Sequence, residues 1–346
     1  MRASSGDPAT PCLRLPESDI LWISENRAAN LATVSLAYET TFAALKLHAK
    51  GDFDQPLKPY VRPGGRADEH ERGRLLSMPA FLGGDHQALG VKLMAGFPVN
   101  IDKGLPRASG LIALFDPVTG VPVAILSCQT ISARRTAAVA SICVDYLAAN
   151  EPLRVAILGA GPIAHETIIS LLLSKPRQVD LVSIYDPRSD RAEALAQLIA
   201  PNTETLITAA ASARLCVSGA NVIIAATTGA KDYIQLDWLS GPWLVVALSH
   251  DDFRQEVMLS ADKLVVDDFD QCNREEMLFG HLVQSGALAR TDVYAELGEI
   301  VSGMKAGREA RERVFVNPMG MAIEDIALAN GIYRIVKDSD TGADQI

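Results

Sequence analysis

Hydrophobic positions in the first third of the chain change from a helical to an alternating pattern. Residues 28–50 carry apolar side chains close to helical spacing and end at Gly51, which predicts an amphipathic helix. Between residues 60 and 126, short apolar or alternating runs are separated by clusters of Gly, Pro and Asp, as in strands joined by turns. These runs are residues 75–81, 89–96, 109–115 and 121–127, and residues 116–120 are the expected hairpin between the last two. We therefore predict a mainly antiparallel sheet with one flanking helix.

Later in the chain, apolar runs alternate with helical patterns. Residues 131–149 are helical in character, and strands are then expected at residues 154–158, 181–185, 222–226, 243–248 and 263–266. This alternation predicts a parallel, doubly wound sheet that binds its ligand at the carboxyl ends of the strands. The expected fold is α/β, with an α+β domain at residues 1–130 and a Rossmann domain at residues 131–313. Residues 314–346 begin with a strand-to-helix pattern and are expected to return to the first domain.

A glycine motif follows the first strand of the Rossmann domain. Gly159 and Gly161 occupy the first two positions of G-x-G-x-x-G/A, which suits a tight turn and close approach to a pyrophosphate at a helix start. Such a turn can exist without a ligand, but Asp186 ends the next strand, where the motif expects an acid for the ribose hydroxyls. NAD is the expected cofactor and NADP is less favoured, because the carboxylate would repel a 2′-phosphate, although Arg188 and Arg191 lie close to it. The predicted cofactor-binding residues are Gly159, Ala160, Gly161, Pro162, Ile163, Asp186, Arg188, Thr227, Thr228 and Ser249.

Composition narrows the class of partner. The 346-residue chain is 48% hydrophobic and 21% charged, with a net charge of −10 and no basic run, which argues against nucleic-acid binding and favours a small-molecule partner. Its five cysteines are widely spaced without a C-x-x-C pair, so neither a disulfide framework nor a metal site is expected and a reducing cytoplasm is favoured. Because eighteen consecutive apolar residues occur nowhere, no membrane span is expected either.

Two charged residues stand out by their position alone. Lys92 interrupts an apolar strand, unlike the usual surface lysine. Asp252 lies in the loop after the strand at residues 243–248, where a carboxylate could hold a substrate amine and move a proton. The alternative for Asp252 is to cap the helix that follows, and the sequence does not separate the two roles.

Four segments in the same order resemble the ornithine cyclodeaminase/mu-crystallin family. They are GVKLMAGFPVNIDKGLPRASG (residues 90–110), ISARRTAA (131–138), the glycine motif and VFVNPMGMAIED (314–325). The resemblance implies an N-terminal domain for substrate binding and dimerisation, a central NAD domain, a C-terminal segment that crosses back, and a homodimer. It also implies that Gly320 lies at the cofactor.

Within that family, ALKLHAKGD, LLSMPAFLGG and FPVNIDKGLPRAS are most similar to the dehydrogenases of 2,3-diaminopropionate biosynthesis, which serves siderophore or antibiotic precursors. The resemblance implies NAD-dependent oxidative hydrolysis of N-(2-amino-2-carboxyethyl)-L-glutamate to 2-oxoglutarate and L-2,3-diaminopropionate. Lys92 and Arg135 match residues that bind the substrate α-carboxylate, and Arg62 is a further match that lies in a variable stretch. Arg107 would suit an additional carboxylate. Lys92 and Asp252 are the expected catalytic residues.

Other activities remain open on the same scaffold. They are an ornithine or lysine cyclodeaminase, a cyclic-imine reductase, an amino-acid dehydrogenase, and a nonenzymatic NAD(P)-binding crystallin-like protein. Asp251 and Gln271 depart from the arginine and histidine that the favoured branch often has at these positions.

Overall fold

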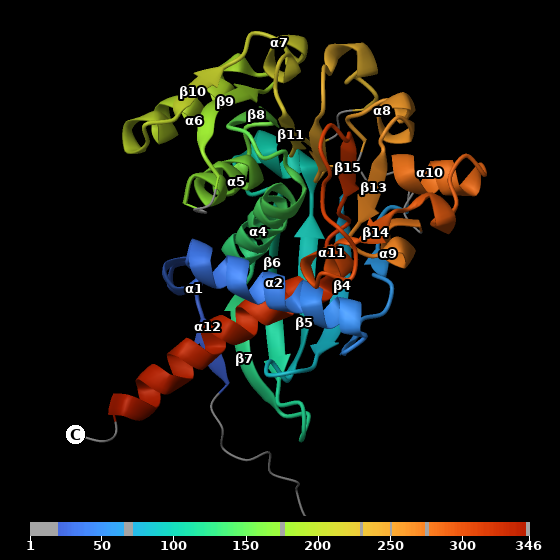
Figure 1. Cartoon of the computed structure of the whole chain (residues 1–346). Coiled ribbons are helices and arrows are strands. Elements are labelled where there is room, and N and C mark those ends of the chain that lie inside the picture. Colours follow the sequence, from blue (N-terminus) through green and yellow to red (C-terminus); the bar gives the residue numbers. More distant parts are fainter. Residues whose placement is uncertain are drawn as a thin grey trace, which may run out of the picture.

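The computed structural model describes residues 20–65, 72–173, 177–228, 231–249, 251–273 and 277–343, which build two sheets (Figure 1). The first sheet has the order β1-β7-β6-β5-β4-β2, with β3 also paired to β4. Its pairs are antiparallel except β1 with β7. Its strands are β1 (Leu21–Ile23), β2 (Phe53–Asp54), β3 (Tyr60–Val61), β4 (Arg74–Leu82), β5 (Ala88–Gly96), β6 (Ala108–Phe115) and β7 (Pro122–Ser127). This confirms the predicted antiparallel sheet.

The helices around this sheet differ from the prediction. The single helix expected at residues 28–50 is two helices, α1 (Glu25–Leu31) and α2 (Val34–Lys50), because the Thr33 side chain accepts a hydrogen bond from the Leu36 N–H at 3.1 Å and starts a new helix. The helix packed on β4, β5 and β6 is α12 (Ala322–Ala343), which lies beside α2 and α4 (Gln129–Leu147) (Figure 1). The expectation of one flanking helix was wrong, since the main cover comes from the far end of the sequence.

The second sheet is parallel throughout, with the order β10-β9-β8-β11-β12-β15-β13-β14. From β8 the chain runs outward through β9 and β10 and then returns to the other side of β8, so the order reverses between β8 and β11. The strands are β8 (Leu153–Leu158), β9 (Val179–Tyr185), β10 (Leu206–Ala209), β11 (Val222–Ala225), β12 (Leu244–Ala247), β13 (Lys263–Val266), β14 (Ala295–Glu296) and β15 (Val314–Asn317). The doubly wound parallel sheet is confirmed.

Short helices connect these strands and also lie between β5 and β6. The α-helices are α5 (Pro162–Leu173), α6 (Ser189–Ile199), α7 (Ala213–Val217), α8 (Gln255–Leu259), α9 (Phe269–Asn273), α10 (Leu278–Gln284) and α11 (Leu297–Val301). The 3₁₀ helices are η1 (Pro98–Lys103), η2 (Ala200–Asn202), η3 (Leu236–Trp238) and η4 (Arg290–Asp292). None of the helices in the described ranges is long and apolar enough to cross a membrane.

The C-terminal part of the chain joins the two sheets. Strand β15 is inserted between β12 and β13 in the second sheet, and all four of its residues are buried. The chain then enters α12, which packs on the first sheet and brings its first turn to β5 and α4 (Figure 1). A second link is His48 on α2, whose ring Nε2 lies 3.3 Å from Asp268 Oδ2 after β13. Residues that follow β13 and β15 therefore meet the first sheet and the helices that pack around it.

Candidate active site

The glycine turn lies at the point where the strand order of the second sheet reverses. Gly159 has φ +99°, and a Cβ added there would lie 2.6 Å from the carbonyl oxygen of Ala226 after β11, so only glycine fits. A Cβ added at Gly161 would meet no described atom within 4 Å, which leaves open space at the start of the twelve-residue α5. This space, together with the helix N-terminus, fits the pyrophosphate of a dinucleotide.

Asp186 completes this turn from the neighbouring strand. It follows β9, and its carboxylate accepts hydrogen bonds from the N–H groups of Ala160 and Arg188, both at 3.0 Å. The acid that was predicted from its place in the sequence therefore lies against the glycine turn. Its position is that of the ribose-binding acid of the dinucleotide motif.

Asp252 is fully buried and does not lie open to the cleft. Its carboxylate accepts hydrogen bonds from the hydroxyls of Thr227 at 2.6 Å, Tyr233 at 3.2 Å and Ser249. Burial raises the pKa of Asp252, and these three hydrogen bonds oppose that rise. Helix α8 is capped at Arg254, so the alternative of a helix cap at Asp252 was wrong. The structure shows a buried carboxylate that ties together the loops after β11 and β12.

A second group of charged side chains gathers where the first turn of α12 meets β5 and α4. Lys92 is 2% exposed, and its Nζ lies 2.6 Å from Asp325 Oδ2. Arg135 on α4 donates from Nε to Asp325 Oδ1 at 3.2 Å and from Nη1 to Glu324 Oε2 at 2.9 Å. Both carboxylates are fully buried. Asp325 thus holds a lysine and an arginine side by side.

Gly320 and Asp267 extend this group toward the second sheet. The Gly320 N–H donates to Asp267 Oδ2 at 2.5 Å, and Asp267 directly follows β13. Gly320 has φ +78°, and an added Cβ would lie 2.7 Å from Arg135 Nη1. We call Lys92, Arg135, Asp267, Glu324 and Asp325 the charged cluster. Because Asp267 and Gly320 follow β13 and β15, the cluster lies at the carboxyl edge that also carries the glycine turn.

Burial and ion pairing shift the pKa values of the side chains in the charged cluster in opposite directions. Burial lowers the pKa of Lys92, and the neighbouring Asp325 carboxylate opposes that change. Burial would also lower the pKa of Arg135, but Asp325 and Glu324 outweigh it and raise the pKa. Burial raises the pKa of Glu324 to about 7, with Arg135 opposing the rise. Ion pairing therefore favours the charged form of Arg135, whereas burial favours the protonated form of Glu324.

The other two predicted cations lie at strand ends of the first sheet. Arg62 stacks its guanidinium 4.6 Å from the ring centre of Tyr60, and Arg107 is exposed just before β6. Of the remaining predicted cofactor residues, Thr228 is exposed after β11, while Thr227 and Ser249 bind Asp252.

Sequence reasoning missed Lys58, Asp267, Glu324 and Asp325. Lys58 is 5% exposed, and its Nζ donates to the carbonyl oxygen of Met319, one residue before Gly320. The acid pair at residues 324 and 325 interrupts an apolar helix, the same kind of signal that singled out Lys92. Lys58 lies in a short stretch between two prolines and offered no comparable signal.

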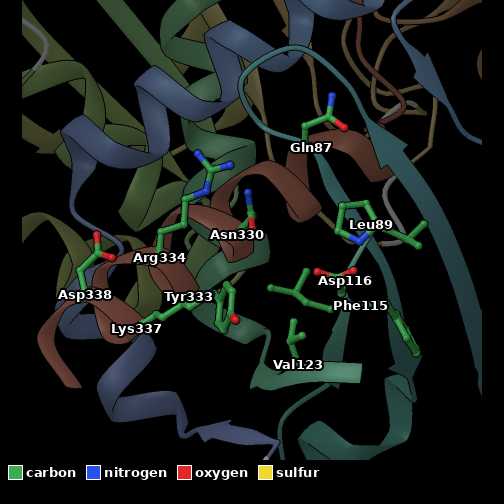
Figure 2. Close-up of a pocket in the computed structure, with 12 residues that line it drawn as sticks. Gln87, Leu89, Phe115, Asp116, Val123, Asn330, Tyr333, Arg334, Lys337 and Asp338 are labelled. Carbon is green, nitrogen blue, oxygen red and sulfur yellow. The ribbon is translucent and has the colours of Figure 1, made fainter. Parts of the chain in front are cut away.

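Two hollows on the described surface lie outside these groups. One, of about 370 Å³, lies between the second half of α12 and strands β5 to β7, and Figure 2 shows Asn330 and Arg334 on one side and Val123 on the other. Arg334 is already engaged there, because it donates to the carbonyl oxygens of Asp85 and His86. The other, of about 550 Å³, is bordered by Gln271, whose buried Oε1 finds no partner within the described ranges.

Comparison with known proteins gives a consistent group of relatives. The family model of the ornithine cyclodeaminase/mu-crystallin family matches residues 23–340. The N-((2S)-2-amino-2-carboxyethyl)-L-glutamate dehydrogenase of Staphylococcus aureus is 37% identical over 305 residues, covering 86% of this chain and 89% of that protein.

Two solved structures share the fold over nearly the whole chain. The Δ1-pyrroline-2-carboxylate reductase of Thermococcus litoralis, in complex with NADH and L-proline, has a TM-score of 0.85 at 27% identity, covering 93% of this chain and 98% of that one. An archaeal alanine dehydrogenase dimer with bound NAD has a TM-score of 0.83 at 26% identity, covering 93% and 97%.

Proposed function

This chain belongs to the ornithine cyclodeaminase/mu-crystallin family, and we propose that it catalyses the NAD-dependent oxidative hydrolysis of N-(2-amino-2-carboxyethyl)-L-glutamate. The observation that carries the proposal is the pair of cations, the buried Lys92 and the partly buried Arg135, held side by side at the carboxyl edge of the nucleotide-binding sheet. Two adjacent cations away from water suit the α-carboxylate of an amino acid. The relative from S. aureus, at 37% identity, supports the choice of substrate.

We propose NAD as the cofactor, because the open space at Gly161 and the carboxylate of Asp186 fit a dinucleotide without a 2′-phosphate. When bound, NAD⁺ supplies the oxidation by accepting a hydride from the glutamyl α-carbon. The chain positions the substrate and neutralises its charge: Lys92 and Arg135 take the α-carboxylate, and Arg62, Arg107 and the buried Lys58 are candidates for the others. Gly320 lies beside Arg135, since an added Cβ would lie 2.7 Å from Arg135 Nη1, and we propose that it contacts the cofactor.

The net reaction consumes one water and releases 2-oxoglutarate, L-2,3-diaminopropionate, NADH and a proton. Water adds to the imine carbon that the oxidation leaves, and the C–N bond of the resulting carbinolamine then breaks. Asp252 is the proposed proton-transfer group. Because its carboxylate is fully buried, its routes for exchanging a proton with the substrate, among the described residues, are the hydroxyls of Thr227, Tyr233 and Ser249.

The test is NADH formation by purified protein with NAD⁺ and N-(2-amino-2-carboxyethyl)-L-glutamate, with ornithine in a parallel reaction and products identified by mass spectrometry. We expect NADH, 2-oxoglutarate and diaminopropionate in equal amounts. Proline and ammonia from ornithine without net NADH would instead show a cyclodeaminase. Absence of turnover with tight NAD(P) binding would favour a binding protein.

A second candidate activity is favoured by the T. litoralis structure, whose complex holds NADH and L-proline. The same arrangement of cations would bind the carboxylate of a cyclic imine. NADH consumption with Δ1-pyrroline-2-carboxylate, faster than any oxidation of the glutamate derivative, would establish this reductase activity. Alanine-dependent NADH formation would likewise identify an amino-acid dehydrogenase.

We also propose a homodimer in a reducing cytoplasm, where the four described cysteines, all free and buried, would stay thiols. The dimer is supported by the face of the first sheet that points away from α12. Val91 pairs with Ala113, and Leu93 with Leu111, so half-exposed apolar side chains lie across β5 and β6. An apolar patch of this kind suits a second copy of the chain.

Introducing a charge on this face should separate the subunits. We expect Ala113→Glu to give a monomer by size-exclusion chromatography with light scattering, because a carboxylate would be buried unpaired in the interface. Val118→Glu is the matched control, since Val118 is 90% exposed at the hairpin between β6 and β7 and should leave the mass unchanged. A wild-type protein that is already monomeric at micromolar concentration would contradict the proposed dimer.

A further inference from the structure

Glu324 is the member of the charged cluster with the poorest compensation for its charge. Its Oε2 accepts hydrogen bonds from Arg135 at 2.9 Å and from the Met321 N–H at 3.2 Å. Its Oε1 is buried and finds no hydrogen-bond partner in the part of the chain that the structure describes. An ionised carboxylate with one unpaired oxygen in the interior is costly, and protonation removes that cost.

The groups around Glu324 come from α12 itself and from four other parts of the fold. Arg135 on α4 attracts the carboxylate, while Asp267 after β13 and Asp325 in the same turn of α12 repel it. Lys92 on β5 reaches the cluster through Asp325, and Lys58 contacts the adjoining turn at Met319. The nearby Cys143 thiol is neutral because burial raises its pKa.

The contacts within the cluster show why Glu324 is the group that changes. Lys92 and Arg135 both contact Asp325. Glu324 therefore has Arg135 as its basic partner among the described residues, and it shares that partner with Asp325. Burial raises the pKa of Glu324 to about 7, which agrees with this incomplete pairing.

We propose that Glu324 stores a proton, taking one up when a substrate carboxylate binds Lys92 and Arg135 and returning it when the ligand leaves. The ligand adds a negative charge beside Glu324, and it competes with Glu324 for Arg135. Both effects raise the proton affinity of Glu324. The proposal rests on the proposed function to the extent that the ligand is a carboxylate. Glu324 is a positioning residue, because it acts through Arg135.

The proposal fixes the direction in which carboxylate affinity changes with pH. If the pKa of Glu324 is higher in the complex than in the free protein, the complex holds more protons. Affinity for a carboxylate is then greatest below pH 7 and falls by up to about tenfold per pH unit as the pH rises above the free pKa of about 7. Glu324→Gln mimics the protonated form, so its affinity should stay near the low-pH value at every pH.

The first test needs no ligand. We expect the infrared spectrum of the wild-type protein to contain a carboxylic-acid band that disappears as the pH rises through 7, and we expect that component to be missing in Glu324→Gln. Glu166→Gln is the matched control, because Glu166 is paired with Arg134 outside the cluster and its pKa is lowered. If Glu324→Gln does not fold, labelling wild-type protein with carboxyl-¹³C glutamate should shift the band. A spectrum without such a band would overturn the proposal.

The second test measures the proton itself. Calorimetric titration of the protein with 2-oxoglutarate in the presence of NADH, in two buffers of different ionisation enthalpy, gives the number of protons taken up per ligand. We expect uptake that is larger at pH 8 than at pH 6 and absent in Glu324→Gln. Binding without uptake would refute proton storage. If 2-oxoglutarate does not bind, the proposed substrate is wrong and pyruvate replaces it; failure of both carboxylates to bind would also refute the inference.

Discussion

Replacing Lys92 with alanine should lower kcat/KM by about 10- to 100-fold while leaving NAD affinity close to that of the wild type. The estimate corresponds to the ~1.5–3 kcal/mol of a hydrogen bond to a charged group. The substrate carboxylate would lose one of two adjacent cations, and Asp325 would keep only Arg135. The measurement is steady-state NADH formation, with NAD affinity determined separately by fluorescence.

Loss of stability must be separated from loss of binding in this variant, because removing one partner of a buried ion pair costs about 3–5 kcal/mol. Lys263 provides a matched control. It is 6% exposed, contacts Glu312 at 3.0 Å, and starts β13 at the end opposite Asp267. We expect Lys263→Ala to be destabilised as well, yet to keep its turnover per folded molecule. Near-normal turnover of Lys92→Ala would remove Lys92 from the proposed site.

Gly161→Ala should weaken NAD binding by about 10- to 100-fold without lowering the melting temperature. An added Cβ meets no described atom within 4 Å, and the backbone of Gly161 does not have a positive φ, so folding should be unaffected. The methyl group would occupy the space proposed for the pyrophosphate and lengthen its hydrogen bonds, each worth ~1.5–3 kcal/mol when charged. Titration calorimetry with NAD⁺ and thermal unfolding are the two measurements.

Two other glycine variants serve as comparisons for Gly161→Ala. Gly96→Ala also places its methyl group in open space with ordinary backbone angles, but at the end of β5, so NAD affinity should not change. Gly159→Ala should instead destabilise the fold, since its Cβ would lie 2.6 Å from the Ala226 carbonyl oxygen. Unchanged NAD affinity in Gly161→Ala would mean that the dinucleotide does not lie over this turn.

Local patterns were sufficient for much of the fold. The strands around Lys92 were predicted to within one residue at each end, because alternation along a strand needs no knowledge of its partners. The break between α1 and α2 was missed because apolar spacing continues across Thr33, although threonine is a common helix cap. The return of residues 314–346 to the first domain was expected, but the strands that α12 covers could not be predicted from local patterns, since its partners lie more than two hundred residues away.

In the candidate site, too, features set by local sequence could be predicted, whereas contacts between distant segments could not. The glycine turn and Asp186 lie within one strand–helix–strand unit, so their spacing could be predicted. Lys92 was found because a charge inside an apolar strand is unusual, but its partner Asp325 is 233 residues away. Applied to α12, the same criterion would have found Glu324 and Asp325. The burial of Asp252 depends on hydroxyls from separate loops, which sequence order does not reveal.

The position of β15 has a consequence for how the chain is made. A ribosome adds about 5–20 residues per second, and N-terminal segments usually fold first. Here the strand between β12 and β13 leaves the ribosome after both of its neighbours, so the nucleotide-binding sheet stays open in its middle until residue 317 has emerged. The ion pair between Lys92 and Asp325 likewise cannot form until residue 325 has emerged. The nascent chain therefore cannot complete either sheet with its covering helices before the C-terminal segment emerges. Both sheets and the site between them must be completed together near the end of synthesis.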